Sequence, residues 1–569
     1  MTNEHSRSWW PVLAIILVAL AWFALAQATH PIDPPEDAYI GFRYARNLAN
    51  GYGLVWNPGE DPVEGATEFI WVVMLAGMYR LGFGMEQAAW ALNMVFGGLT
   101  IVLVALAAYV FSRRNLWMTG FAAGAFAVGP IAYHVRMGFA TPLFTLLLAL
   151  VFVLAASLAL QAHPPRRAWL LTIALALASL FMGLTRPEGV IFAGMMILAL
   201  LWLDRAGRGR LILALGLFLV LPGLAYFLWR WQYFGYPLPN TFYVKSAGSF
   251  LHFRYFPNIY AMFEFLGPFL IALGMGFWRM ERERGFAWFV LLLPAFIFPW
   301  FYLLIAQLQN LGSRFQYPVY PVFLIATAAF LSLFLWREGF VWARPRWREL
   351  MVALFALGLL LFGAFAAAGA SLMLAGLVGI IALLGSPTMR DRFPQAHRPI
   401  LYRALLAAFI LLSMAYNVRL TRTFYPSRYD DLKYVGERLQ PFADKGYTLV
   451  STEAGWLPYF SEWRTIDPFG LNDEYVAHNG LTEAYLDSVH PDVILYHDAA
   501  VPDPPQWGEM VAKLRAYAEK NGFILAAVIE RAGPRFLHVY WVRADNPDAE
   551  AIIDAITGVE GFTYQYKAP

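Results

Sequence analysis

The sequence contains no cysteine, and only 14% of its residues are charged. The absence of cysteine excludes disulfides, thiolate metal sites and thiol nucleophiles, and it is compatible with an oxidising compartment outside the cell. Soluble domains are usually about one-quarter charged. Together with 59% hydrophobic residues and a mean hydropathy of +0.51, the low charge indicates that lipid is the solvent for most of the chain.

Long apolar segments recur along the first three-quarters of the chain. They predict about thirteen membrane-spanning helices of roughly 17 to 24 residues each. Their centres lie near positions 18, 100, 126, 151, 176, 196, 220, 267, 296, 327, 358, 378 and 409. The first segment, Trp9 to Ala26, is longer than the core of a usual signal peptide, so we interpret it as a retained span whose preceding residues lie in the cytoplasm.

Arginine is concentrated in alternate connecting segments, which the positive-inside rule assigns to the cytoplasm. The clusters lie at residues 113–114, 166–167, 205–210, 279–284, 337–348 and 390–398. An odd number of spans then places the C-terminus outside, provided that the apolar stretch Phe69 to Leu81 does not cross the membrane. At about thirteen residues this stretch is short for a span. We predict that it is an amphipathic or half-buried helix within a long exterior loop, residues 29–87.

Hydrophobicity falls after the last predicted span. Residues 1–423 therefore form the predicted membrane module, and residues 424–569 a soluble extracytoplasmic domain. In this domain the pattern predicts helices at 429–439, 474–489 and 506–521, and strands at 447–451, 492–496, 523–530 and 536–542. The predicted fold class is an α-helical polytopic membrane protein with a C-terminal α/β domain. This domain has more acids than bases, which argues against nucleic acid as a partner.

Two adjacent carboxylates, Glu36 and Asp37, begin the first exterior loop soon after the first span. Carboxylates at a membrane surface are candidates for a general base or for cation binding. A structural alternative is a helix N-terminus, where acids after proline are favourable and Arg43 pairs with Asp37. The residues alone leave both readings open.

Four cations break the positive-inside pattern by lying on the predicted exterior side. They are Arg136, Arg186, Lys245 and Arg314. Positive charge there is suited to stabilising a departing phosphate, although any single one of the four is also explained as a snorkelling interface residue. Arg186 has a further alternative, a structural joint with Glu188. His134 lies near this group, but no set of His, Asp and Glu has the spacing of a metal site, so we predict no metal ligand and no required cofactor, without excluding a divalent metal.

Several motifs in order along the chain resemble bacterial polyprenyl-phosphate-sugar glycosyltransferases with the C-type membrane fold, and most closely the mycobacterial terminal arabinofuranosyltransferases. The motifs are EDAYI (36–40), RYA (43–45), GYGLVWNPGE (51–60), VEG (63–65), TRPEG (185–189), YPLPNTFYVK (236–245) and EAGWLPY (453–459). In that family an acid of the first exterior loop is the base, which implies Asp37, with Glu36 as the alternate. The chain departs from the family pattern at Glu36, which is usually Asp, at Ala140, which is often an acid, and at Glu68, which is often Asn.

The resemblance implies a membrane enzyme in the bacterial inner membrane that transfers a sugar from a polyprenyl-phosphate donor to an extracytoplasmic glycan, lipid or protein, by an inverting single displacement. Phosphate contacts are expected from Lys245, Arg314, Arg186 and Arg136. Substrate contacts are expected from Arg43, Tyr44, Asn57, Glu64, Asn240 and Tyr243. The alternatives are a flippase for lipid-linked sugars and a non-catalytic envelope assembly protein. The sugar, the acceptor, the linkage and the oligomeric state are not defined by the sequence.

Overall fold

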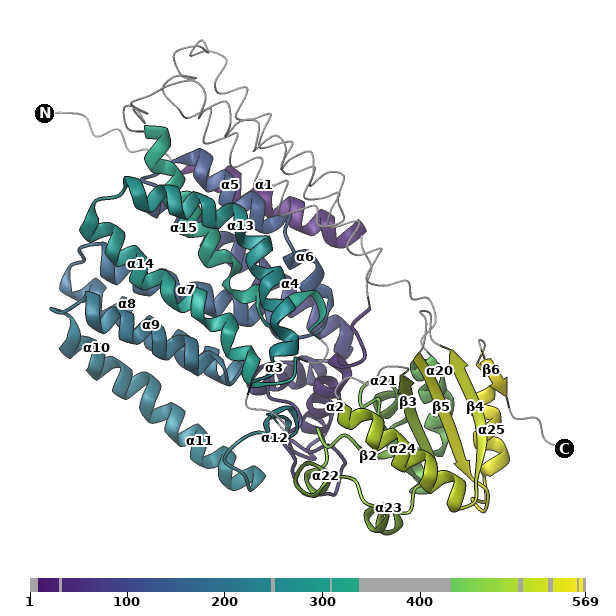
Figure 1. Cartoon of the computed structure of the whole chain (residues 1–569). Coiled ribbons are helices and arrows are strands. Elements are labelled where there is room, and N and C mark those ends of the chain that lie inside the picture. Colours follow the sequence, from purple (N-terminus) through teal and green to yellow (C-terminus); the bar gives the residue numbers. More distant parts are fainter. Residues whose placement is uncertain are drawn as a thin grey trace, which may run out of the picture.

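The computed structural model describes a helical module followed by an α/β domain (Figure 1). The described residues are 9–29, 33–246, 251–307, 310–336, 431–499, 505–530, 536–559 and 562–565. The spans predicted near positions 358, 378 and 409, and the domain boundary predicted at 423/424, lie outside these residues.

The helical module contains long apolar helices joined by short connections. Its elements are α1 (Trp10–Thr29), α2 (Ala38–Ala49), α3 (Phe69–Arg80), α4 (Met85–Phe111), α5 (Leu116–Ala127), α6 (Ile131–Arg136), α7 (Thr141–Leu160), α8 (Pro165–Thr185), α9 (Gly189–Leu203), α10 (Arg208–Leu215), η1 (Gly216–Val220), α11 (Leu221–Phe234), α12 (Asn240–Ser246), η2 (Phe253–Tyr255), α13 (Phe256–Arg279), α14 (Arg282–Ile297), η3 (Phe298–Leu304), η4 (Leu311–Ser313), η5 (Tyr317–Val319) and α15 (Tyr320–Trp336). Each predicted centre from position 18 to position 327 falls within a helix. Among the described residues, seven helices are long and apolar enough to cross a membrane.

Local sequence signals explain where these helices begin and end. The side chain of Asn115 caps α5 by accepting hydrogen bonds from the backbone N–H groups of Trp117 and Met118. Proline occupies the first turn of α7 and of α8, where its missing N–H is harmless. Helix α11 ends at Gly235, whose φ of 80° lies in the left-handed region that favours glycine.

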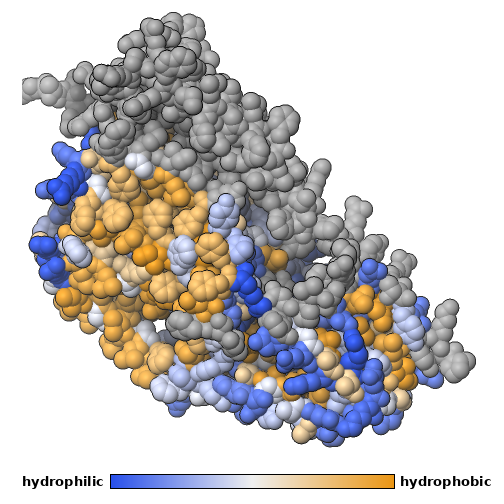
Figure 2. Space-filling view, viewed as in Figure 1, coloured by the Kyte–Doolittle hydropathy of each residue, from blue (hydrophilic) through white to orange (hydrophobic). Residues whose placement is uncertain are grey.

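The helical module has an apolar interior and an apolar exterior. Helix α7 contacts α4, α8, α9 and α14, and Phe144, Leu148 and Val151 are fully buried in this packing. Figure 2 shows a broad apolar surface on the outside of the helical module. A helix that is hydrophobic on all sides is typical of a membrane span. The protein is therefore a multi-pass membrane protein.

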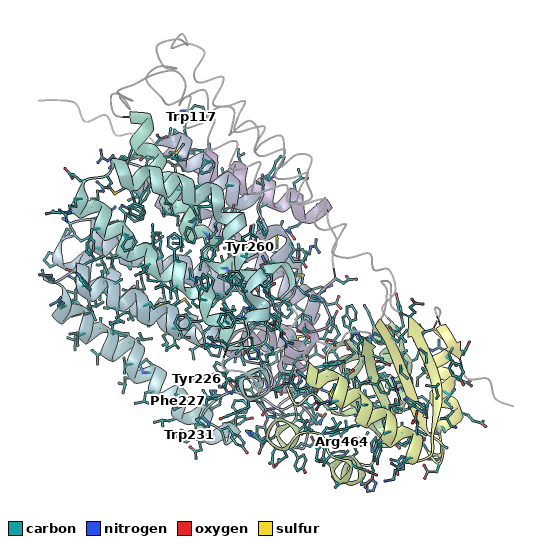
Figure 3. All side chains as sticks on the ribbon, in the orientation of Figure 1. Trp117, Tyr226, Phe227, Trp231, Tyr260 and Arg464 are labelled. Carbon is teal, nitrogen blue, oxygen red and sulfur yellow. The ribbon has the colours of Figure 1, made fainter. Side chains whose placement is uncertain are left out.

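Four of the aromatic side chains that Figure 3 labels lie toward opposite ends of the helical module. Trp117 is at the start of α5, whereas Tyr226, Phe227 and Trp231 are on α11 near its C-terminal end. Trp231 is 44% exposed. Such an arrangement matches the two interfacial belts where amphipathic rings meet lipid headgroups.

One end of the helical module faces the C-terminal domain. The N-terminal ends of α4 and α7 lie at this end, because Glu86 accepts a hydrogen bond from Tyr39 and Glu68 accepts one from the backbone N–H of Ala140. The arginine clusters at 113–114, 166–167 and 205–210 adjoin the opposite ends of α4, α7, α8 and α9. The described arginine clusters therefore lie away from the C-terminal domain.

The C-terminal domain is a six-stranded mixed sheet with helices on both faces (Figure 1). Its strand order is β2-β1-β3-β5-β4-β6. The strands are β1 (Thr448–Ser451), β2 (Arg464–Ile466), β3 (Val493–Ala499), β4 (Phe523–Glu530), β5 (Phe536–Arg543) and β6 (Phe562–Gln565), and the helices are α20 (Asp431–Leu439), η6 (Gln440–Lys445), α21 (Trp456–Ser461), α22 (Glu474–Asn479), α23 (Glu483–Val489), α24 (Pro505–Lys520) and α25 (Ala549–Thr557). The helix predicted at 474–489 is divided, because Gly480 adopts a φ of 73° between α22 and α23.

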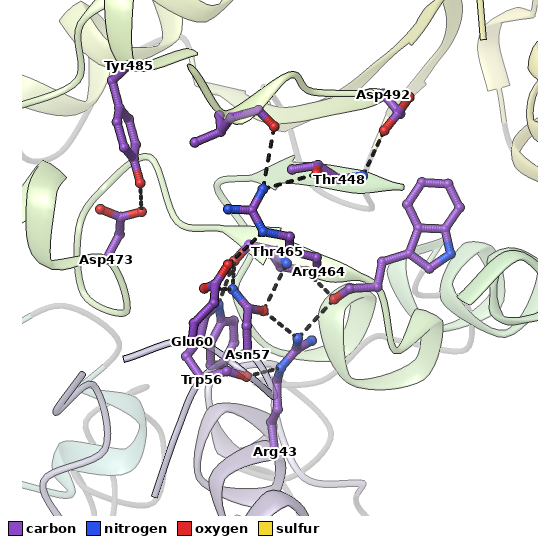
Figure 4. Close-up of polar contacts among 12 residues, drawn as sticks. Arg43, Trp56, Asn57, Glu60, Thr448, Arg464, Thr465, Asp473, Tyr485 and Asp492 are labelled. Carbon is purple, nitrogen blue, oxygen red and sulfur yellow. Dashed lines mark hydrogen bonds and ion pairs between the residues drawn. The ribbon is translucent and has the colours of Figure 1, made fainter. Parts of the chain in front are cut away.

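The segment between α1 and α4, which carries Glu36 and Asp37, shares one hydrophobic core with the C-terminal domain. It joins α2 and α3 to α20, α21 and α25, and includes Trp71, Leu432, Leu457 and Ile552, all of which are essentially buried. Arg43 of α2 stabilises this interface by donating hydrogen bonds to Asn57 Oδ1 and to the carbonyl oxygen of Trp56 (Figure 4). It also donates to the carbonyl oxygens of Pro458 and Trp463. The C-terminal domain is therefore docked onto the loop that carries Glu36 and Asp37.

We expect Arg43→Ala to lower the free energy of unfolding by about 3 kcal/mol, because four buried acceptors lose a charged donor. The measurement is the thermal midpoint of the detergent-purified protein, with the rate of proteolysis of the C-terminal domain. Arg46→Ala is the matched control. Arg46 lies on the same helix and crosses the same interface, to Glu462, which is 47% exposed, and to the carbonyl and ring of Tyr459. It makes fewer and less buried hydrogen bonds than Arg43, so a smaller loss of about 1 kcal/mol is expected. Equal effects of both changes would contradict the assignment.

Candidate active site

Asp37 stands directly before α2, in the segment between α1 and α4. Its carboxylate lies 3.4 Å from Arg314 Nη2 and keeps 23% of its side chain exposed. This separation is long for a charged hydrogen bond. Asp37 does not cap α2 with its side chain, and Arg43 binds elsewhere. The structural alternative in which Arg43 pairs with Asp37 is therefore wrong.

Glu36 points in a different direction from Asp37. Its carboxylate accepts a hydrogen bond from the backbone N–H of Gly455, and the residue is buried. A Cβ atom at Gly455 would lie 1.8 Å from the Glu36 carbonyl oxygen, so only glycine allows this close approach. The two adjacent acids thus differ in environment, because Glu36 contacts the C-terminal domain and Asp37 remains accessible beside Arg314.

Three of the four predicted cations converge near Asp37. Lys245, Arg186 and Arg314 all lie within electrostatic range of one another, and Asp37 interacts with Lys245 and Arg314. Burial lowers the pKa of Lys245, while Asp37 raises it in part. The guanidinium of Arg314 packs 3.7 Å from the ring centre of Phe139, and that of Arg186 packs 5.0 Å from the ring centre of Phe315. Aromatic rings thus hold both arginines in place.

Arg186 and Arg314 each have a nitrogen whose N–H group has no acceptor among the described residues. Within the described residues, Arg314 Nε and Arg186 Nη1 are buried and have no hydrogen-bond acceptor. A buried donor without an acceptor costs about 1–3 kcal/mol, more when charged, and such groups commonly mark a binding site. The missing acceptors would be supplied by an anionic group with several oxygens, such as a phosphate.

Three further residues complete this cluster, and sequence reasoning did not assign a site role to any of them. Glu188 pairs with Arg186 at 2.7 Å and accepts a hydrogen bond of 2.9 Å from Tyr302. Glu68 is near Arg186 and Arg314, and burial raises its pKa, with Arg186 opposing the rise. The departures from the family pattern at Glu68 and Ala140 were the available signal. The two positions meet here, because Glu68 accepts a hydrogen bond of 3.1 Å from the Ala140 backbone.

The fourth predicted cation and His134 have other surroundings. Arg136 donates hydrogen bonds to Gln27 Oε1 and to the Gln27 carbonyl, and it stacks on Trp90. A phosphate contact from Arg136 stays a prediction. His134 is buried against Tyr317, and burial, with a smaller effect of Arg314, lowers the pKa of His134 to about 3. His134 is therefore neutral at pH 7.

The residues predicted to contact substrate have partners within the protein. The contacts of Arg43 are described above. Tyr44 donates to the Val63 carbonyl, and Glu64 pairs with Arg230. Asn57 contacts Thr465, Asn240 donates to the carbonyls of residues 470, 471 and 473, and Tyr243 packs on His478. The contacts of Asn57, Asn240 and Tyr243 connect the membrane module to the C-terminal domain, whereas those of Tyr44 with Val63 and of Glu64 with Arg230 lie within the module. A direct substrate role for the six residues stays a prediction.

A cavity of about 580 Å³ opens beside the cation cluster, between the membrane module and the C-terminal domain. Lys245, His252 and Arg254 line one side, and Phe469, Met510 and Lys513 line the other. Its mixture of cationic, aromatic and polar side chains suits a polar ligand such as a sugar chain. Lys245 thus connects the cavity to the Asp37 region.

One wall of the cavity is formed by a turn built around Asp467. The buried carboxylate accepts hydrogen bonds from the backbone N–H groups of Phe469, Gly470 and Asn472. Burial raises the pKa of Asp467 to about 6, although the hydrogen bonds from Asn472 oppose the rise. Asp467 is therefore protonated at a higher pH in the folded state than in the unfolded chain.

As the pH falls from 7 toward 4, the wild type should gain stability relative to Asp467→Asn by about 2 kcal/mol. The sign follows from the raised pKa, since the charge that is unfavourable in the fold above about pH 6 is neutralised below it. Thermal midpoints of both proteins across this range test the expectation. Asp444→Asn, which changes an exposed acid of the same domain, should follow the wild type. A constant difference between wild type and Asp467→Asn would contradict it.

Comparison with solved structures shows the same architecture in two known proteins. The ArnT structure from Cupriavidus metallidurans bound to undecaprenyl phosphate matches with a TM-score of 0.56 at 14% identity, over 93% of this chain and 97% of that one. An oligosaccharyltransferase from Archaeoglobus fulgidus, tethered to an acceptor peptide, matches with a TM-score of 0.50 at 13% identity, over 94% of this chain and 74% of that one.

The chain has the C-type glycosyltransferase fold. This confirms the predicted fold class of a polytopic helical module with a C-terminal α/β domain.

Sequence comparison agrees with the predicted resemblance. The chain is 27% identical over 322 residues to a terminal β-(1→2)-arabinofuranosyltransferase of Mycobacterium tuberculosis, covering 53% of this chain and 48% of the relative. It is 28% identical over 260 residues to the Corynebacterium glutamicum protein of the same name, covering 42% of this chain and 36% of the relative. The chain thus matches at most about half the length of these relatives. Residues 421–545 match a domain family of unknown function, DUF8728.

Proposed function

We propose that this protein is a membrane glycosyltransferase that takes a sugar from a polyprenyl-phosphate donor and transfers it to an extracytoplasmic glycan, lipid or protein. The observation that carries the proposal is the convergence of Asp37 with Arg314, Arg186 and Lys245, in which two buried arginine nitrogens have no acceptor among the described residues. A general base beside a phosphate-binding cation cluster is what sugar transfer from a phosphodiester requires.

In the proposed reaction, Arg314, Arg186 and Lys245 bind the donor phosphate. Because Arg314 then binds phosphate, Asp37 becomes available to the acceptor hydroxyl. Asp37 accepts the hydroxyl proton as the acceptor oxygen forms a bond to the anomeric carbon. The bond from that carbon to the phosphate oxygen breaks, and its electron pair leaves with the polyprenyl phosphate. A single displacement of this kind inverts the anomeric centre.

The cavity lined by Lys245 and Phe469 is the proposed route for the acceptor. The outer face of the bacterial inner membrane is the proposed location of the site. This orientation is supported by the described arginine clusters, which lie at the opposite end of the helical module from Asp37 and the C-terminal domain. The names of the sequence relatives make arabinofuranose the first sugar to test.

Mass spectrometry of lipid-linked sugars tests the proposal in cells that lack the protein and are complemented with wild type or Asp37→Asn. One polyprenyl-phosphate sugar should accumulate, and only the wild type should remove it. Unchanged lipid-linked sugars would overturn the proposal and favour a scaffold role. Accumulation that wild type and Asp37→Asn remove equally would contradict a carboxylate base at Asp37 and favour a flippase.

A further inference from the structure

Two histidines and one glutamate come together on the sheet of the C-terminal domain, far from each other in sequence. One ligand atom from each of Glu453, His497 and His538 lies within 4.8 Å of the others. All three residues, together with Asp431, fall within the segment 421–545 that matches the domain family of unknown function. We propose that this cluster is a zinc-binding site.

The strand register places the three side chains in one row. His497 of β3 and His538 of β5 are a directly opposed antiparallel pair, so their side chains share one face of the sheet. Ser451 of β1 is aligned with Leu495 of the parallel strand β3, so two residues further on Glu453 reaches the level of His497. Two of the three ligands, His497 and His538, therefore lie on strands, which hold metal ligands more precisely than loops do, and Glu453 lies two residues beyond the end of β1.

The distances and orientations suit coordination of one ion. Glu453 Oε1 lies 3.0 Å from His497 Nδ1, which is close to the separation of two ligands bound to the same zinc ion at about 2.0–2.2 Å each. The rings of His497 and His538 are 5.7 Å apart and nearly perpendicular, at 85°. Two imidazoles and one carboxylate favour zinc over magnesium or calcium, which prefer oxygen ligands. Three protein ligands leave a fourth position for water or another small group.

The surroundings of His538 support the assignment. Asp431 of α20 contacts His538 Nδ1 at 2.7 Å and also accepts a hydrogen bond of 2.6 Å from Tyr540. A carboxylate that accepts from one imidazole nitrogen orients the ring and directs the lone pair of the other nitrogen toward a metal. His538 is fully buried, whereas the side chain of His497 is 18% exposed. The ion would therefore enter from the side of His497.

The proposed site is connected to the first exterior loop. Glu453 is two residues from Gly455, whose backbone N–H donates to the Glu36 carboxylate. An ion that fixes Glu453 also restrains the segment 453–455 against the loop that carries Asp37. We therefore expect zinc to stabilise the docking of the C-terminal domain. The zinc site itself does not rest on the proposed transferase activity.

The test uses the full chain, purified in detergent without a histidine tag, and elemental analysis by mass spectrometry. About one zinc per chain is expected in the wild type, and a strong loss in His497→Asn and in Glu453→Gln. Asp431→Asn should bind zinc about 10- to 100-fold more weakly, because it loses the negative charge and one of the two oxygens that contact His538 Nδ1. His490→Asn is the matched control, since His490 lies in the same domain at a left-handed position that asparagine tolerates.

A second measurement decides the question if the variants fold poorly. After the wild type is stripped with a chelator, calorimetric titration with zinc chloride should show one site and raise the thermal midpoint, whereas magnesium chloride should do neither. A wild type that carries no zinc and takes up none in this titration would overturn the proposal. Unchanged zinc content in folded His497→Asn and Glu453→Gln would overturn it as well. Both results are independent of sugar transfer, so this proposal and the transferase proposal fail separately.

Discussion

Asp37→Asn is expected to reduce sugar transfer by about 10²- to 10⁴-fold, the usual contribution of a positioned general base. Asparagine preserves the size of the side chain but cannot accept the hydroxyl proton. Because Asp37 is partly exposed and its contact with Arg314 is 3.4 Å long, the substitution should leave the fold intact. The measurement is single-turnover transfer from a synthetic polyprenyl-phosphate arabinofuranose in detergent micelles, with the thermal midpoint recorded in parallel.

Two variants make this experiment specific to Asp37. Asp61→Asn changes another acid of the same exterior loop, which is exposed, and should retain wild-type activity. Glu36→Gln removes a buried carboxylate that accepts the Gly455 N–H, so it should affect the thermal midpoint as well as the rate. Retained activity in both Asp37→Asn and Glu36→Gln would disprove the proposed mechanism. Loss of activity in Glu36→Gln alone, with the fold unchanged, would transfer the role of base to Glu36.

Arg314→Gln is expected to reduce kcat/KM for the donor by about 10²- to 10³-fold, because it removes a fixed positive charge from the departing phosphate. Arg314→Lys should recover only part of this loss, since lysine keeps the charge but lacks the planar fork of donors. Arg186→Gln should have a similar effect, because its guanidinium also has an unused buried donor among the described residues. Steady-state kinetics with varied donor concentration measures all three variants.

Arg136→Gln is the matched control for these arginines. Arg136 is bound to Gln27 and Trp90 and is separate from the cluster around Asp37. Activity within about twofold of the wild type is expected for a residue outside the reacting centre. A loss as large as that of Arg314→Gln would instead support the phosphate contact predicted for Arg136 from sequence. Full activity in Arg314→Gln and in Arg186→Gln would exclude phosphate binding by this cluster.

Several features of the site were accessible from sequence because they are rare in their surroundings. Cations on the predicted exterior side are few, so the sequence alone indicated Arg186, Lys245 and Arg314 as candidate site residues. The same reasoning selected Arg136, which the structure places elsewhere, because exposure on one side of the membrane does not define which side chains meet. The acids Glu68 and Glu188 were visible only as a departure from a pattern and as a neighbour of Arg186.

The C-terminal domain shows a similar division. Strands β4 and β5 were predicted within a few residues, because each is a short run rich in apolar, β-branched and aromatic residues. The three-residue strand β2 and the short helix α21 were not predicted, because each is too short to show a period. The helix predicted at 474–489 is interrupted at Gly480, because the left-handed backbone of this glycine ends α22 although the surrounding sequence favours a helix.

By itself, the sequence determined four properties of the protein. They are its residence in lipid, the positions of most of its spans, the connecting segments that carry arginine, and the presence of an α/β domain after the spans. These properties depend on composition and on short-range periodicity. Only the tertiary structure decided that Arg43 holds two domains together, that Asp37 faces Arg314 while Glu36 faces Gly455, and that Glu453, His497 and His538 form one row. Those contacts join residues up to several hundred positions apart, and packing between elements determines which of them meet.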